Sequence, residues 1–132
     1  MKNRPWIRIV LSAALVCAGM SAGAQSFPTK PITMVVPFPP GGVADTVGRP
    51  VAEAMSRHLK QSIVVENKGG AGGGIGMAQV AKSKADGYTV LMSLSSLVVL
   101  PEADKILQRP PMFQVNQLKA IARFTADPTV LV

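Results

Sequence analysis

Short runs rich in β-branched residues alternate with helical patterns along this chain, and the alternation limits the folds open to it. The apolar runs Ile32 to Val36, Ile63 to Glu66 and Tyr88 to Ser93 are typical of buried strands. Val43 to Leu59 carries an apolar residue at every fourth position, which indicates one helix face, and Ile75 to Ser83 predicts a second helix. The order predicts an α/β fold, a right-handed βαβαβ unit with a parallel sheet.

Two single residues qualify the first helix. Pro50 lacks an N–H group and its ring clashes with the preceding turn, so we expect the helix to kink or restart there. His58, the only histidine, falls late in the same helix and is expected at its surface, far from the loops described below.

The pattern weakens after Ser93. Leu94 to Leu100 is compatible with a short helix or with a continued strand. Asp104 to Gln117 contains two adjacent prolines and is expected to be mostly loop, and Ala120 to Arg123 predicts a strand. Thr129 to Val132 begins an apolar strand-like run as the sequence ends, which indicates a fragment or, alternatively, a short terminal strand.

Residues 1–24 have the order of a cleavable secretory signal. Its positive start contains Lys2, Arg4 and Arg8. Ile9 to Met20 is apolar but shorter than the roughly 20 residues that span a bilayer, and Ala22-Gly23-Ala24 supplies the small residues of a cleavage site. We therefore expect cleavage after Ala24 and export to the periplasm. An uncleaved membrane anchor or lipidation at Cys17 is less favoured.

Cleavage would also change the composition available for folding. Removing 24 of the 132 residues leaves 108, enough for one small domain at residues 25–132. The only cysteine leaves with the signal, so no internal disulfide is expected, and the net charge falls from +7 to +4. The remaining basic residues are scattered, which argues against nucleic-acid binding, although a modest positive charge favours an anionic ligand.

The stretch from Pro37 to Thr46 follows the first strand and opens the first helix. Prolines stiffen the turn, and Gly41 and Gly42 allow a ligand to approach the backbone closely. Unpaired N–H groups at a helix start can hold a carboxylate or phosphate, and ligands of open α/β sheets bind at this edge. The alternative is that the loop only makes the turn and that Asp45 only caps the helix.

The Gly-rich stretch from Asn67 to Gly76 follows the second strand and opens the second helix, so it can supply a second anion site. It does not contain the glycine spacing of a dinucleotide fingerprint, because Ile75 stands at the sixth position counted from Gly70. It also lacks the Gly-Lys-Ser/Thr of a P-loop. An NAD or ATP site is therefore not favoured, and a flexible linker is the alternative.

Other candidate side chains are few. Ser93, Ser95 and Ser96 end the third strand at the same edge and are candidate hydroxyl donors. No Cys/His cluster, carboxylate pair or nucleophile with an adjacent base is visible, so we expect no metal, no cofactor and no enzyme activity.

Four motifs in this order resemble the Bug family, the periplasmic substrate-binding proteins of tripartite tricarboxylate transporters. They are Phe27-Pro28-Thr29-Lys30-Pro31-Ile32; Val36-Pro37-Phe38-Pro39-Pro40-Gly41-Gly42 with Asp45; Val65-Glu66-Asn67 with Gly70-Ala71-Gly72-Gly73 and Gly76; and Ala85-Asp86-Gly87-Tyr88-Thr89. The resemblance extends from Phe27 to about Ser93 and continues loosely to Val132.

The resemblance implies part of lobe one of a two-lobed periplasmic-binding-protein fold of type II-like architecture. It implies a monomeric receptor for small carboxylates, such as di- or tricarboxylates, that delivers them to membrane transporter subunits. The implied ligand-lining residues are Phe38, Pro39, Gly41, Gly42, Gly72 and Gly73. Asp45 matches a position that faces a polar or amino group of the ligand in some members, and Ser93 and Ser95 fall in the region of a third contact loop.

The chain also departs from the family. Pro50 interrupts a helix that relatives continue, and Leu100 to Gln117 differs from the usual sequence. Family members are longer, so the second lobe would be absent and an isolated piece would bind weakly or not at all. The alternatives to a receptor are a small exported enzyme domain acting on an anionic substrate and a truncated gene product without function.

Overall fold

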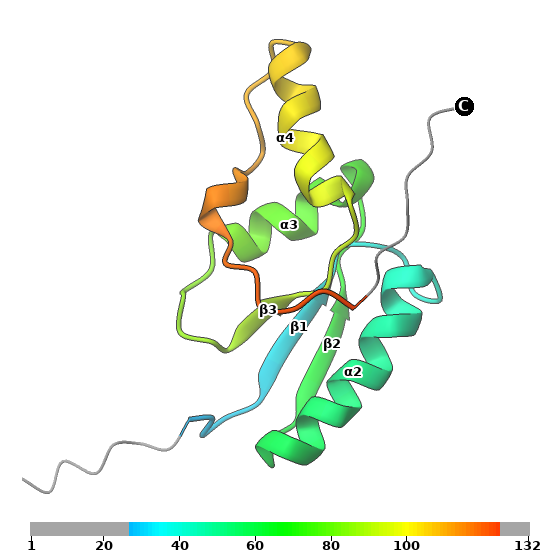
Figure 1. Cartoon of the computed structure of the whole chain (residues 1–132), viewed down its shortest axis with the longest axis vertical. Helices are drawn as coiled ribbons and strands as arrows, with labels where there is room; N and C mark the ends of the chain where they lie inside the picture. Colours follow the sequence, from blue (N-terminus) through cyan, green and yellow to red (C-terminus); the bar gives the residue numbers. More distant parts are fainter. Residues whose placement is uncertain (1–26, 125–132) are drawn as a thin grey trace, which may run out of the picture.

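The computed structural model describes residues 27–124 of the chain. Three parallel strands form one sheet in the order β2-β1-β3. Central strand β1 (Ile32–Val36) pairs with β2 (Ile63–Asn67) along its whole length and with β3 (Thr89–Leu91) from Thr33 to Val35. The α/β class and the parallel βαβαβ order are confirmed, and all three strands end at one edge of the sheet (Figure 1).

Helix α2 (Val43–Leu59) covers one face of the sheet, and α3 (Gly74–Ala81) lies on the other (Figure 1). Alternate residues of a strand face opposite sides. Met34 and Val36 accordingly pack into one buried cluster with Ala44 and Ala52 of α2. The middle residues of the fourfold apolar pattern, Val47, Val51 and Met55, pack against this cluster, whereas its first residue, Val43, is 65% exposed.

The prediction of a restart at Pro50 is wrong, because α2 runs through it as one helix. The carbonyl that loses its partner belongs to Thr46, four residues earlier. Thr46 and Pro50 are both exposed, so water can satisfy this carbonyl without any break in the helix. His58 is exposed in the last turn of α2, as expected.

Helix α3 ends at Ala81, two residues before the predicted Ser83, and the end has a clear local cause. Both the backbone N–H and the hydroxyl of Ser83 donate to the carbonyl of Val80, at 3.0 and 2.6 Å. The predicted turn at Ala85-Asp86-Gly87 has a similar origin, because Asp86 accepts the Tyr88 N–H at 3.0 Å and Gly87 has φ +83°. Strand β3 (Thr89–Leu91) is shorter than the predicted run Tyr88 to Ser93.

The region after β3 contains helix α4 (Ser96–Ile106), so the helical alternative for Leu94 to Leu100 is correct. From Leu107 to Phe124 the chain is mostly loop with one short turn, η2 (Val115–Gln117). The prediction of a strand at Ala120 to Arg123 is wrong, because these residues are exposed and their backbone pairs with none of the three strands.

A second buried cluster holds α3 and the later chain together. It contains Met77, Ala78 and Phe113, with Leu97 and Leu100 of the α4 region packed against it. No helix within residues 27–124 is both long and apolar enough to cross a membrane. The predicted signal (1–24) and the run Thr129 to Val132 lie outside the described residues.

Candidate functional site

Three loops meet the carboxyl edge of the sheet, one after each strand. We call them the first loop (37–42, after β1), the second loop (68–73, after β2) and the third loop (92–95, after β3). The first two lie in contact, because the Lys68 N–H donates to the Val36 carbonyl at 2.8 Å and Gly69 lies against Pro39. The structure therefore brings the two predicted anion sites together.

The first loop delivers the chain to α2 without a side-chain cap. Gly42 is extended at the N-cap position, and neither Val43 nor Ala44 finds an acceptor for its N–H among the described residues. Unsatisfied N–H groups give a helix start a partial positive charge. This end of α2 can therefore donate to an anion.

Asp45 turns back from the first turn of α2 and is buried, with 3% of its surface exposed. Its Oδ2 accepts from the Gly41 N–H and from Arg49 Nε, both at 2.9 Å. Its Oδ1 accepts from Asn67 Nδ2 at 2.9 Å. The hydrogen bond from Arg49, followed by those from Gly41 and Asn67, holds the pKa of this carboxyl well below its usual range.

Arg49 and Asn67 complete the surroundings of Asp45. Arg49 Nη2 donates to Asn67 Oδ1 at 3.1 Å, and Asn67 Nδ2 also donates to the Phe38 carbonyl at 3.1 Å. Sequence reasoning gave neither residue a role. The four-residue spacing of Asp45 and Arg49 on a helix is a signal for their pairing, whereas nothing local indicates the contact with Asn67.

Aromatic packing also joins the two loops. A side chain at Gly73 would meet the Phe38 ring at 3.2 Å and Met77 at 3.0 Å, and Gly73 has φ +99°. Only glycine meets both conditions without strain. The Phe38 ring packs against both buried clusters, so its place between the loops is fixed from each side of the sheet.

The second loop turns through four consecutive residues with positive φ, Gly70 to Gly73. This explains the glycine run, since most residues avoid such backbone. The Gly72 N–H has no acceptor among the described residues. Gly72 also lines an open hollow of about 560 Å³ with apolar Leu100 and Met112.

The third loop is placed differently from the other two. Among residues 27–124 the Ser93 hydroxyl donates only to the neighbouring Leu94 carbonyl at 3.3 Å, and Ser95 is exposed at the start of α4. Ser96 Oγ is buried and finds no hydrogen-bond partner in this part of the chain. No hydrogen bond within residues 27–124 ties these serines to the first two loops.

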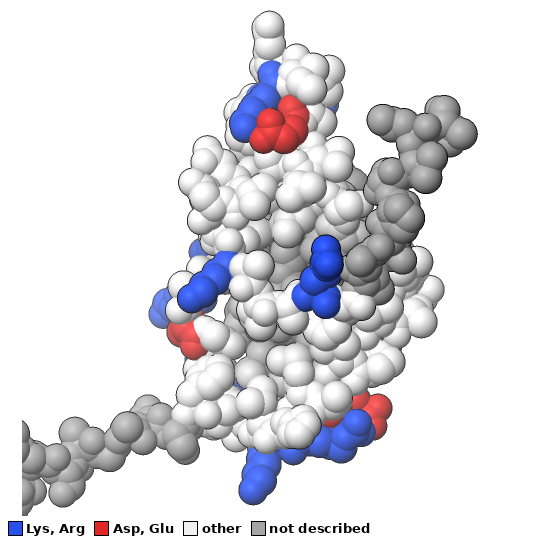
Figure 2. All heavy atoms as spheres, in the orientation of Figure 1, with Lys and Arg blue, Asp and Glu red and all other residues white. Residues whose placement is uncertain are grey.

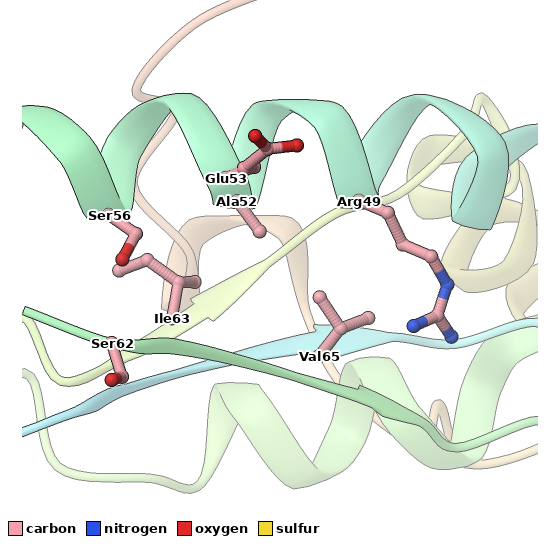
Figure 3. A pocket seen from close by; sticks show the side chains of 7 residues that line it. All are labelled: Arg49, Ala52, Glu53, Ser56, Ser62, Ile63 and Val65. Carbon is pink, nitrogen blue, oxygen red and sulfur yellow. The ribbon is translucent and has the colours of Figure 1, made fainter.

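A second hollow, of about 400 Å³, lies between α2 and β2 rather than at the carboxyl edge. Figure 3 shows Ala52 and Ser56 of α2 above Ile63 and Val65 of β2, with Arg49 reaching from the helix toward the strand. No group of three potential metal ligands occurs within residues 27–124. On the face in Figure 2, Lys and Arg lie in separate groups, several beside Asp or Glu.

Comparison with known proteins identifies the family. The model described as "Tripartite tricarboxylate transporter family receptor" matches residues 47–132. A UPF0065 protein of Bordetella pertussis is 39% identical over 99% of this chain, and "Protein BugT" of the same organism is 47% identical over 71%. The chain spans 40% and 29% of these two relatives, respectively.

The structure of "periplasmic binding protein BugD" aligns with 49% of the chain at 54% identity and a TM-score of 0.48, covering 22% of that protein. Since this overlap is short, the assignment depends on the sequence matches. They confirm the resemblance seen in the four motifs. The chain belongs to the tripartite tricarboxylate transporter receptor family.

Proposed function

We propose that this chain forms part of lobe one of an exported receptor that captures small carboxylates for a tripartite tricarboxylate transporter. The family is one of receptors, which supports binding without chemical conversion of the ligand. In this proposal the signal is removed after Ala24 and the mature protein works in the periplasm as a monomer, with a second lobe and membrane transporter subunits as its partners.

One observation carries the proposal. The N–H groups of Val43 and Ala44 have no acceptor in the described chain, and they follow a loop that contacts the second loop, where the Gly72 N–H also has none. Backbone donors beside a helix start suit a carboxylate, because they supply hydrogen bonds and partial positive charge together. Phe38, Pro39, Gly41, Gly42 and Gly73 would line the same place.

The ligand class follows from the charge of this edge. Asp45 and Arg49 of α2 pair with each other, and the first loop contains no charged residue, so attraction for an anion would come from the backbone. Such a site would bind the carboxylate group of a ligand but not distinguish the rest of the molecule. Residues beyond these loops, Ser93 and Ser95 among them, would supply selectivity. An enzyme role for Asp45 is disfavoured, because its oxygens already accept three hydrogen bonds.

Val43→Pro tests this proposal without disturbing the fold. Val43 is the first residue of α2 and is 65% exposed, and the extended Gly42 before it suits a following proline. Proline removes one N–H for which residues 27–124 offer no acceptor. We expect roughly tenfold weaker binding of malate or citrate in an NMR titration, which follows weak binding, because hydrogen bonds to charged groups are among the strongest.

Val43→Ala is the matched control, since it removes the same side chain but keeps the N–H. It should bind as the parent does. Equal affinities for the proline and alanine variants, both folded, would exclude the start of α2 as the carboxylate site. Stronger stabilisation by a nucleotide than by any carboxylate would exclude the ligand class.

A further inference from the structure

Asp45, Arg49 and Asn67 form a closed set of contacts that joins three parts of the chain. Asp45 and Arg49 stand one turn apart on α2, and Asn67 ends β2. Each of the three side chains contacts the other two, at 2.9 to 3.1 Å. Two further bonds fix the first loop to this set, through the Gly41 N–H and the Phe38 carbonyl.

We propose that Asp45, Arg49 and Asn67 are positioning residues that lock the first loop against the end of β2, and that Asp45 does not contact the ligand. The role in ligand binding rests on the proposed function, but the lock itself does not. Both carboxylate oxygens of Asp45 are engaged internally and only 3% of the residue is exposed, which leaves little surface for a ligand group.

The lock would serve binding by fixing the loop in advance. A loop that is already ordered loses less conformational freedom when a ligand arrives, so the same contacts give a higher affinity. A backbone N–H group points wherever the backbone holds it. The direction of the N–H groups at the start of α2 therefore depends on how firmly the lock fixes the first loop.

The geometry requires arginine at position 49. Arg49 donates from Nε to Asp45 and from Nη2 to Asn67, so one planar group meets two acceptors in different elements. A lysine ammonium has the same charge but lacks this fixed fork. Arg49→Lys should therefore break the lock, although the lysine could still form a simple charge pair with Asp45.

The test compares Arg49→Gln and Arg49→Lys with Arg57→Gln in the ligand-free chain. Arg57 is the matched control, because it pairs with Glu53 at the same spacing on the same helix, and this is the only side-chain hydrogen bond that it makes within the described residues. The readout is hydrogen exchange of the Gly41 amide, followed by NMR. We expect roughly tenfold faster exchange in both Arg49 variants and an unchanged rate in Arg57→Gln.

A pH titration of the Gly41 amide shift separates positioning from a general loss of stability. Arg49 is the only charged group that acts on Asp45 among the described residues, and it lowers the pKa of that carboxyl. The midpoint should therefore lie well below that of an ordinary aspartate in the parent chain and rise in Arg49→Gln. Arg57→Gln should titrate like the parent.

Unchanged Gly41 exchange and an unchanged midpoint in a folded Arg49→Gln chain would overturn the proposal. If that variant does not fold, the parent titration decides alone, and an ordinary midpoint for Asp45 would overturn it. None of these measurements uses a ligand. A failure of Val43→Pro to weaken binding would thus reject the proposed function while leaving the lock intact.

Discussion

The first two loops and the third are held in different ways, although all three end strands of one sheet. Asn67, at the end of β2, donates to the Phe38 carbonyl of the first loop and to Asp45 of α2, and the Phe38 ring lies against Gly73 of the second loop. The serines of the third loop make no such bond in the described chain, and Phe113 is the only buried residue between positions 107 and 124.

The contrast separates a preformed side of the candidate site from an adaptable one. Elements with few buried contacts open locally at low cost, whereas tied loops open only with the core. We therefore infer that carboxylate recognition belongs to the first two loops, and that the third can differ among relatives without loss of the fold. Each of the following changes tests one side of this comparison.

Phe113→Ala should have the largest effect, and the effect should be confined to α4 and the chain that follows it. Phe113 is 4% exposed and packs with Met77 and Ala78. Losing a buried phenylalanine costs about 3–5 kcal/mol. Hydrogen exchange should show residues 96–118 losing protection while β1 and β2 keep theirs, and Val115→Ala, at a partly exposed position, should change little. Equal loss in both regions would show that the two sides unfold together.

Gly76→Ala should weaken the packing between the first and second loops. An added Cβ would lie 2.7 Å from the Lys68 carbonyl oxygen and 2.8 Å from Pro37, and the carbonyl is backbone that cannot simply turn aside. We expect a loss of about 1–3 kcal/mol in the free energy of unfolding, measured in urea. Gln79→Ala, on the exposed face of the same helix, is the control. A neutral result for Gly76→Ala would mean that the second loop is not tightly packed against the first.

Low pH should weaken the contacts that hold the first loop, because it protonates Asp45. Because folding lowers the pKa of this carboxyl, its contribution is fully present above the unfolded value near 4 and is lost as the pH falls toward the folded value. The stability difference between the parent and Asp45→Asn should therefore be largest at neutral pH and shrink below about pH 4. A difference that does not depend on pH would show that the charge of Asp45 is not what matters.

Ile106→Ser should have the smallest effect. Ile106 is 82% exposed at the end of α4, so the change should stay within about 0.5 kcal/mol in urea unfolding. A larger loss would reveal a contact that holds α4 in place. It would argue against an adaptable third loop.

The sequence predicted the sheet and both flanking helices because periodicity is a local signal. It also located the first two loops, since each glycine run lies between a strand and a helix. It did not predict the contacts of Asp45 with Asn67, which lies 22 residues away, because such pairs depend on how the strands align. The false strand at Ala120 to Arg123 has a similar origin, since local pattern alone does not show whether a partner strand is available.

An NMR titration of the chain with malate would show whether the first two loops bind the carboxylate. We expect the amide signals of Gly42, Val43, Ala44 and Gly72 to shift together with one affinity, while those of Gly87 at the opposite edge and Lys105 on α4 stay in place. Shifts confined to α4, or to the hollow between α2 and β2, with none at the first two loops, would contradict this expectation.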